Sequence, residues 1–187
     1  PLNQLYTWRL LIYQIFPDRF RRGKDNKTET LINDDNLNKD IIFHDNWDDV
    51  PNYMPDPETG KILNNDFFGG NLQGIIDKLD YLKDLGVTII YLNPIFKSFS
   101  NHRYDTGDYL NIDPMLGDRD TFQSLCDLAE ERGMVVILDG VFSHTGSDSI
   151  YFNKNGNYPS IGAWQSKDSR YYPWYRFLEY PNEYDCW

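Results

Sequence analysis

Asp139 and His144 follow an apolar run closely enough to belong to a site for a polar ligand. The run, residues 134–138, reads Met-Val-Val-Ile-Leu and is typical of a parallel-sheet strand buried on both faces. Because α/β folds collect binding groups at the carboxyl ends of parallel strands, this pair favours binding of a sugar or a similar polar molecule. A structural role is the alternative, with the aspartate capping a turn and the histidine an ordinary hydrogen-bonded residue.

Ser143 raises a third possibility, a Ser-His-Asp triad formed with the same aspartate and histidine. A serine nucleophile of an α/β hydrolase sits in a Gly-x-Ser-x-Gly turn that exposes its hydroxyl. Residues 141–145 read Val-Phe-Ser-His-Thr and contain no such turn. The sequence therefore disfavours nucleophilic catalysis by this serine.

Composition excludes several classes of protein. The chain has 187 residues, a formal net charge of −11 and 40% hydrophobic residues, which together predict a folded domain with a core. The acidic balance argues against nucleic acid or an anionic membrane as a partner, since either would need a basic surface. No apolar run approaches the roughly 18 residues of a membrane span. Aromatic residues reach 16%, and flat rings with a polar group suit sugar faces as well as cores.

The cysteines and the ends of the chain carry little information. Cys126 lies in a helical apolar pattern and Cys186 is the penultimate residue, so we expect no disulfide. The sequence begins at Pro1 and stops at Trp187, which leads us to expect a piece of a longer protein. The missing signal peptide is then uninformative, and the cellular compartment stays open.

Three strands are predicted from β-forming apolar runs, at residues 8–16, 87–92 and 134–138. The first is followed by a long polar loop at 20–68 and the second by a loop at 95–117, whose residues 101–109 are dense in hydrogen-bonding groups. A loop as long as the first one, inside a compact domain, is usually functional or contains short elements of its own.

Two helices are predicted between these strands. One runs over 72–85 with Asn71 as its N-cap, and the other runs over 118–132. Strand, helix, strand, helix, strand indicates an α/β fold with a parallel sheet, or part of a (β/α)8 TIM barrel. Long loops after strands and tight turns before them, at Gly86 and Gly133, favour the barrel, whose site is built from the post-strand loops. A flavodoxin-like domain is disfavoured, because in such domains the loops after the strands are compact.

Four segments together resemble the α-amylase superfamily, glycoside hydrolase family thirteen, and most closely its neopullulanase and cyclomaltodextrinase branch. They read Ile-Tyr-Gln-Ile-Phe-Pro-Asp-Arg-Phe (12–20), Phe-Phe-Gly-Gly-Asn-Leu-Gln-Gly-Ile (67–75), His-Arg-Tyr-Asp-Thr-Gly-Asp-Tyr (102–109) and Leu-Asp-Gly-Val-Phe-Ser-His-Thr (138–145). The resemblance implies a partial barrel, comprising strands one to three with helices one and two. Residues 1–144 are then the N-terminal part of the catalytic barrel. Residues 145–187 are the truncated start of an aromatic-rich insertion, domain B.

The resemblance also implies a retaining hydrolase of α-1,4- or α-1,6-linked glucans, with two catalytic carboxyl groups about 5 Å apart. Tyr104 and His144 match residues that bind the sugar at the cleavage point. Asp139 matches an aspartate that supports the site, and Asp105 is expected to fix the loop that carries Tyr104. No catalytic residue is assigned, because the family's nucleophile and acid/base lie on later strands, beyond Trp187.

Calcium sites of the family are altered in this sequence. Asn71 replaces the aspartate of a Gly-Gly-Asp motif, and Ser143 replaces the asparagine before the histidine. After the first strand, residues 21–24 read Arg-Arg-Gly-Lys, which leaves Asp25 and Asn26 as the nearby polar residues. Calcium needs about six to eight oxygen ligands. We therefore expect no metal and no other cofactor.

Partners follow from the two functional hypotheses. A hydrolase fragment would bind an α-glucan oligosaccharide weakly and would need the C-terminal half of its barrel for activity. The alternative is a non-catalytic glucan-binding module that uses its aromatic surface alone. A barrel that stops after three strands leaves an open strand edge and uncovered apolar surface, so we expect the chain alone to be inactive and to self-associate.

Overall fold

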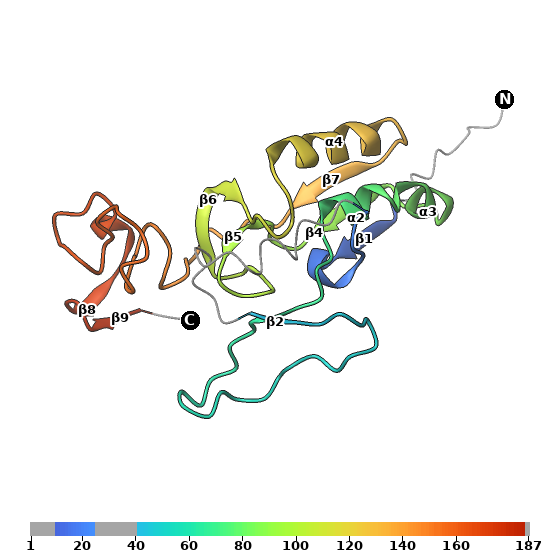
Figure 1. Ribbon diagram of the computed structural model, residues 1–187. Coiled ribbons are helices and arrows are strands. Elements are labelled where there is room, and N and C mark those ends of the chain that lie inside the picture. The colour runs from blue at the N-terminus through green and yellow to red at the C-terminus, as the bar shows by residue number, and fades with distance from the viewer. Residues whose placement is uncertain (1–9, 25–40, 186–187) are drawn as a thin grey trace.

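The computed structural model describes residues 10–24 and 41–185. Its centre is a parallel sheet in the order β1 (Ile12–Ile15), β4 (Ile89–Leu92) and β7 (Val135–Leu138). The three strands run in register, so that Ile12 lies opposite Ile89 and Ile89 opposite Val135. All three carboxyl ends therefore lie at one edge of the sheet, as Figure 1 shows.

The helices connect these strands, as the alternation in the sequence predicts. α2 (Leu72–Ile76) and α3 (Leu79–Asp84) precede β4, and α4 (Arg119–Glu130) precedes β7. The prediction of one unbroken helix over 72–85 is wrong. The amide of Lys78 donates to the carbonyl of Ile75 at 3.0 Å, and this three-residue turn interrupts the helical ladder between α2 and α3.

Both predicted helix starts are capped by side chains. Asn71 accepts a hydrogen bond from the amide of Gly74 at 2.8 Å, and Asp118 accepts one from the amide of Thr121 at 2.8 Å. Each cap satisfies a backbone donor that the first helical turn leaves without a partner.

The core lies between the helices and one face of the sheet. Alternate residues of β4 point into it, and Ile90 and Leu92 are fully buried. The helices contribute aliphatic side chains at helical spacing, which form one continuous apolar face. The buried members of the core are Ile15, Leu72, Ile75, Leu79, Leu82, Val87, Ile90, Leu92, Ile95, Leu116, Leu125, Ala129 and Met134.

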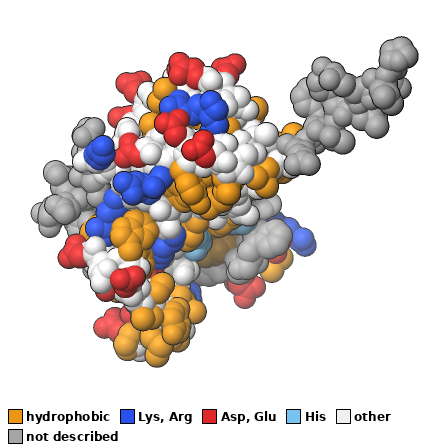
Figure 2. Space-filling model, turned by 90° about the vertical axis from the view of Figure 1, so that its right-hand side faces the viewer, with side chains coloured by type: hydrophobic (Ala, Val, Ile, Leu, Met, Phe, Trp, Pro, Cys, Tyr) orange, Lys and Arg blue, Asp and Glu red, His pale blue; other side chains and the backbone are white. Residues whose placement is uncertain are grey.

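The other face of the sheet is largely open, which contradicts the expectation that 134–138 is buried on both faces. Val135 is 61% exposed and Ile137 is 40% exposed, and Ile12 in β1 is 57% exposed. The apolar run indicates that both faces of the strand are suited to packing. Within the described residues, however, β7 pairs with a strand on one side alone, β4. Figure 2 shows several groups of hydrophobic side chains at the surface of the molecule.

The loop predicted at 95–117 contains two strands that the sequence did not predict. It contains an antiparallel pair, β5 (Phe96–Ser98) and β6 (Thr106–Ile112), with register shifts along the ladder. The turn between these strands projects from the carboxyl edge of the central sheet (Figure 1).

The long loop after β1 contains short elements, as its length suggests. A 3-10 turn, η1 (Pro17–Arg19), follows β1, and the parallel pair β2 (Ile42–Phe43) and β3 (Asp66–Phe67) precedes α2. Gly70 passes η1 so closely that an added Cβ would lie 2.1 Å from the carbonyl oxygen of Pro17. A glycine is therefore required where the loop returns to the end of β1.

Residues 145–185 fold around their aromatic side chains. They contain a 3-10 turn, η3 (Tyr172–Trp174), and the antiparallel pair β8 (Phe177–Glu179) and β9 (Glu183–Tyr184). Tyr151 and Phe152 are buried at the centre of this second cluster. It lies beside the β5–β6 pair, away from α4 (Figure 1).

Two further expectations from the sequence concern disulfide bonds and membrane-spanning helices. Cys126 in α4 is a free thiol, while Cys186 lies outside the described residues, so the expected absence of a disulfide stays a prediction. In the part of the chain that the structure describes, no helix is both long and apolar enough to cross a bilayer.

Candidate functional site

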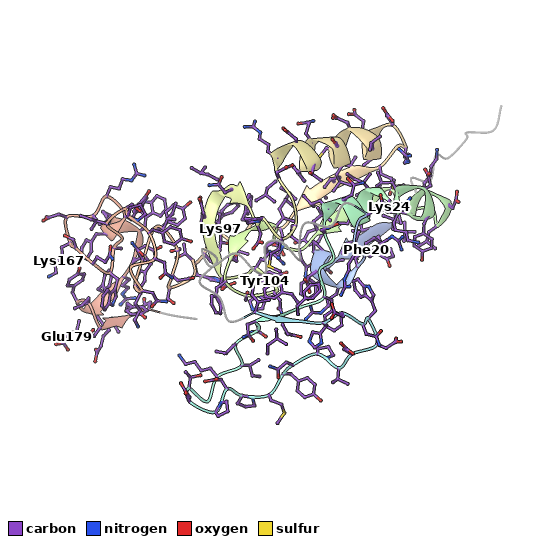
Figure 3. All side chains as sticks on the ribbon, viewed as in Figure 1. Phe20, Lys24, Lys97, Tyr104, Lys167 and Glu179 are labelled. Atoms are coloured by element: carbon purple, nitrogen blue, oxygen red, sulfur yellow. The ribbon has the colours of Figure 1, made fainter. Side chains whose placement is uncertain are left out.

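Tyr104 lies in the turn between β5 and β6, which is held by hydrogen bonds of its own. The amide of Ser100 donates to Oδ2 of Asp105 at 3.1 Å, and the hydroxyl of Ser100 donates to the same carboxylate. The amide of Tyr104 donates to Nδ1 of His102 at 3.0 Å. These bonds close the turn and fix the position from which the Tyr104 ring projects (Figure 3).

Arg103 anchors this turn through its buried side chain. Its backbone has φ +61°, which is uncommon for a residue with a side chain, and the side chain is fully buried. Its Nη1 donates to the carbonyl of Asn101 at 2.7 Å, and Nε lies 3.2 Å from Oδ2 of Asp113 in a buried ion pair. Removing either partner would leave a buried charge uncompensated, so this pair fixes the turn.

Asp139 meets Tyr104 across the edge of the sheet. Asp139 follows β7 directly, and its amide donates to the carbonyl of Leu92 at the end of β4, at 3.0 Å. Its Oδ2 accepts a hydrogen bond from the Tyr104 hydroxyl at 2.8 Å. Burial, together with this hydrogen bond and the negative charge of Asp139, raises the pKa of Tyr104 to about 12. The phenol is therefore a neutral donor at physiological pH.

His144 lies on the same rim. Its Nε2 is 3.0 Å from the carbonyl oxygen of Tyr104, and its Nδ1 is 3.1 Å from the Ser143 hydroxyl. A carbonyl can only accept, so Nε2 carries the proton in this bond and Nδ1 accepts from the serine when the ring is neutral. A sugar hydroxyl could accept a hydrogen bond from Nε2 only by displacing the carbonyl.

The same geometry disfavours the Ser-His-Asp triad. In such a triad the histidine nitrogen opposite the serine is oriented by a carboxylate. Here that nitrogen faces the backbone carbonyl of Tyr104, and Asp139 accepts from the Tyr104 phenol. Ser143 is therefore a partner of the His144 ring rather than a nucleophile.

Tyr109 was not singled out by the sequence reasoning, although it belongs to the 102–109 segment. Its hydroxyl donates to the carbonyl of His144 at 2.9 Å and also contacts the carbonyl of Val141. Its ring packs against that of Tyr151 with centroids 5.6 Å apart. Tyr109 thus joins β6 to the segment that carries His144.

A cavity of about 1490 Å³ opens between the β5–β6 turn and the aromatic segment. It exceeds the roughly 300–1,000 Å³ of a site for one drug-sized ligand, so it has room for a larger one. Its wall combines aromatic rings with charged and hydroxyl groups, and consists of His102, Tyr104, Asp105, Tyr109, Leu110, Phe142, Ser143, His144, Thr145, Gly146, Ser147, Tyr151, Phe152, Arg170, Tyr171, Trp174, Tyr175, Arg176, Tyr184 and Asp185.

The four residues singled out from the sequence are brought together, in two layers. Tyr104, His144 and Asp105 contribute to the cavity wall. Asp139 is absent from that wall and stands behind Tyr104, as its hydrogen-bond acceptor. Such an arrangement can present a flat ring and polar groups to a sugar while a carboxylate fixes the ring.

The residues at the altered calcium positions do not fit the metal. Oδ1 of Asn71 already accepts from two amides, those of Gly23 at 3.0 Å and Gly74 at 2.8 Å. The Ser143 hydroxyl is engaged with His144. Among the described residues, no group of three or more His, Cys, Asp or Glu side chains could hold a metal ion. Asp25 and Asn26 lie outside the described residues.

Comparison with known proteins gives a consistent answer. A family model described as "Alpha amylase, catalytic domain" matches residues 14–185. The amylopullulanase of Thermoanaerobacterium saccharolyticum is 48% identical over 190 residues, which cover 95% of this chain and 14% of that protein. The intracellular maltogenic amylase of Bacillus subtilis (strain 168) is 41% identical over 172 residues, 90% of this chain and 24% of that protein.

Solved structures agree with these sequences. The type III pullulan hydrolase from Thermococcus kodakarensis superimposes with a TM-score of 0.75 at 36% identity, over 95% of this chain and 30% of that one. The chain therefore spans only a minor part of the length of each of these relatives.

Proposed function

Because the chain belongs to the family of α-amylase catalytic domains, we propose that it supplies sugar-binding residues to a retaining hydrolase of α-1,4- or α-1,6-linked glucans. Its three parallel strands and their helices are part of a TIM barrel. The observation that carries the proposal is the Tyr104–Asp139 hydrogen bond at the carboxyl edge of the sheet, beside an open cavity. In barrels of this kind the active site lies at that edge.

Each of the candidate residues has a role in this proposal. The Tyr104 ring stacks on the sugar at the cleavage point, where a flat ring suits an oxocarbenium-like centre. Asp139 holds that ring through its hydroxyl, and Asp105 holds the turn through Ser100. When the glucan binds, the Nε2–H group of His144 donates its hydrogen bond to a sugar hydroxyl instead of to the Tyr104 carbonyl.

The substrate class rests on the names of the relatives. They include amylopullulanases, maltogenic amylases, a cyclomaltodextrinase and a neopullulanase. One structural neighbour, from Arthrobacter globiformis, is a cyclic α-maltosyl-(1→6)-maltose hydrolase at 32% identity and a TM-score of 0.68. An α-glucan oligosaccharide is the ligand common to these names.

We assign no catalytic carboxylate within these 187 residues. Asp139, whose carboxylate contacts Tyr104, is committed to the phenol. The chain by itself is therefore proposed to be inactive. Measurable release of reducing sugar from maltooligosaccharides by the pure chain would contradict this assignment.

Activity is best tested in a chimera, in which this chain replaces the matching segment of the Thermoanaerobacterium saccharolyticum amylopullulanase. The chimera should hydrolyse starch and pullulan. Tyr104→Ala should lower kcat/KM by about 10²-fold, the expected effect of losing a ring that positions the substrate. Tyr81→Ala is the matched control, because Tyr81 lies in α3 and is 52% exposed. Equal activity of the two variants would overturn the role of Tyr104.

A non-catalytic glucan-binding module is the second candidate. It is favoured by one observation, the 60% exposed Trp174 in the cavity wall. Calorimetry with maltoheptaose separates the two functions in the unmodified chain. The hydrolase part should bind weakly or not measurably, whereas a binding module should show useful affinity that Trp174→Ala abolishes.

The open face of the sheet supports a further part of the proposal, that the chain alone self-associates. In a closed barrel this face points to the interior, where it is covered by the remaining strands. Here Val135 and Ile137 are exposed on the edge strand β7, which is a template for pairing with another chain. Light scattering at rising concentration should detect oligomers, and Ile137→Lys should reduce them. A concentration-independent monomer would contradict self-association.

A further inference from the structure

The guanidinium group of Arg22 binds three backbone carbonyls from two separate segments. Its Nε donates to the carbonyl of Phe68 at 2.7 Å, and Nη1 donates to that of Asp45 at 3.1 Å. Nη2 donates to the carbonyl of His44. One side chain thus ties the residue after β3 and the segment after β2 to the chain that follows η1.

The surroundings of this guanidinium are shaped to hold a cation. The rings of Phe43 and Trp47 lie 4.8 Å and 5.6 Å from its central carbon, within the range of cation–π attraction. Gly69 has φ +74°, and an added Cβ there would lie 2.9 Å from the Phe43 ring and 3.4 Å from Nε of Arg22. Glycine at this position leaves room for the ring and the guanidinium.

Convergent carbonyl oxygens are also the ligands that calcium selects. The fixed positive charge of Arg22 among these oxygens disfavours a divalent cation there, since like charges repel most strongly at short range. We propose that Arg22 acts as a built-in cation, which fastens the 41–68 segment to the chain after η1 so that this part of the fold does not require calcium.

The fastened segment reaches the candidate site. The carbonyl of Asn64 accepts from the amide of Asn101 at 2.7 Å, and Oδ1 of Asp66 accepts from the side-chain amide of Asn101 at 2.8 Å. Asn101 begins the part of the turn that ends at Tyr104. Arg22 is therefore a positioning residue for this turn, acting through the 41–68 segment.

The first experiment uses the unmodified 187-residue chain and two variants. Thermal unfolding of the unmodified chain should be the same in calcium and in a chelator. Arg22→Gln should lower Tm and accelerate hydrogen exchange of the His44 amide, which donates to the Phe67 carbonyl at 2.9 Å, by about tenfold or more. Arg21→Gln removes the same charge from an exposed neighbouring side chain and should change neither.

The second experiment tests whether the cation itself matters. In Arg22→Ala, low millimolar methylguanidinium should slow exchange of the His44 amide again, while equal concentrations of sodium chloride or urea should not. Arg22→Lys, which keeps a point charge without the planar donors, should fall between the unmodified chain and Arg22→Gln. The proposal is overturned if calcium raises the Tm of the unmodified chain, if Arg22→Gln behaves like Arg21→Gln, or if methylguanidinium has no more effect than salt.

Discussion

The hydroxyl of Tyr104 and the carboxylate of Asp139 are joined at 2.8 Å, although 35 positions separate the two residues in the chain. The bond links the turn after β5 to the end of β7. A hydrogen bond to a charged acceptor is stronger than one between neutral groups, and it fixes the orientation of the ring. The ring therefore faces the cavity in one preferred position before any ligand binds.

Replacing this acceptor should lower the pKa of Tyr104. In Asp139→Asn the negative charge is gone but burial remains, so the phenol should ionise below the value of about 12 in the unmodified chain. Absorbance of tyrosinate, compared with and without Tyr104→Phe, measures this titration. Tyr158 is an internal control, because burial also raises its pKa to about 12 and Asp139 is not among the causes. An unchanged Tyr104 titration would contradict the bond.

The raised pKa of Tyr104 also predicts a dependence of stability on alkaline pH. The unfolded tyrosine ionises with its ordinary pKa of 10.0, while the folded one stays neutral to about 12. Its contribution to the free energy of unfolding is therefore complete below pH 10.0 and is lost as the pH rises through about 12. Over this pH range the free energy of unfolding, measured with urea, should fall more for the unmodified chain than for Tyr104→Phe.

His102 should stay neutral to a lower pH than an unburied histidine, because its pKa is lowered. Burial lowers its pKa below 6.5, Asp105 opposes this effect, and Arg103 adds to it. Because the neutral ring is favoured in the folded state, its contribution to stability is lost as the pH falls through the folded pKa. NMR of the ring protons measures the titration, and Asp105→Asn should lower the pKa further. A value at or above 6.5 would contradict the burial of this ring.

Truncation of the core should be far more costly than truncation of the surface. Leu125 in α4 is fully buried, so Leu125→Ala should lower the free energy of unfolding by about 2–5 kcal/mol. Leu178 is 64% exposed, and Leu178→Ala should change it by about 0.5 kcal/mol or less. Denaturant unfolding of both variants checks the difference. Similar losses would mean that the core is placed incorrectly.

Asn71 should matter more than an ordinary helix cap. Asn71→Ala removes the acceptor for two buried amides, and we expect a loss of about 1–3 kcal/mol. Asp118→Ala removes the exposed cap of α4 and should cost about 1 kcal/mol. The two Tm values, measured under identical conditions, give the comparison. An equal or larger loss in Asp118→Ala would show that the second amide bond contributes nothing.

Sequence periodicity predicted the elements that build the core but not their coverage. Aliphatic residues at helical spacing located α4 and the region of α2 and α3, and β-forming runs located β4 and β7. The run at 134–138 did not indicate that one face of the strand is open, because composition is independent of which neighbours are present. The β5–β6 pair escaped prediction since its ladder is irregular and its turn depends on Arg103 at φ +61°.

The site was predictable in its residues and not in its contacts. Tyr104, Asp139 and His144 were singled out by spacing and by resemblance, and parallel strands brought them to one edge. The involvement of Tyr109 and Arg22 depends on hydrogen bonds to backbone carbonyls. Such bonds carry no side-chain signature on the acceptor, so a sequence pattern cannot indicate them.

The register of the sheet limits how this segment can be exchanged between related enzymes. Ile12, Ile89 and Val135 form one row across the three strands, and successive rows alternate between the helix-covered face and the open face. A single-residue insertion within β4 would reverse the facing of the later side chains of that strand. Recombination between homologues should therefore succeed when differences in length fall in the surface loops. It should fail when an odd number of residues is inserted into or removed from a strand.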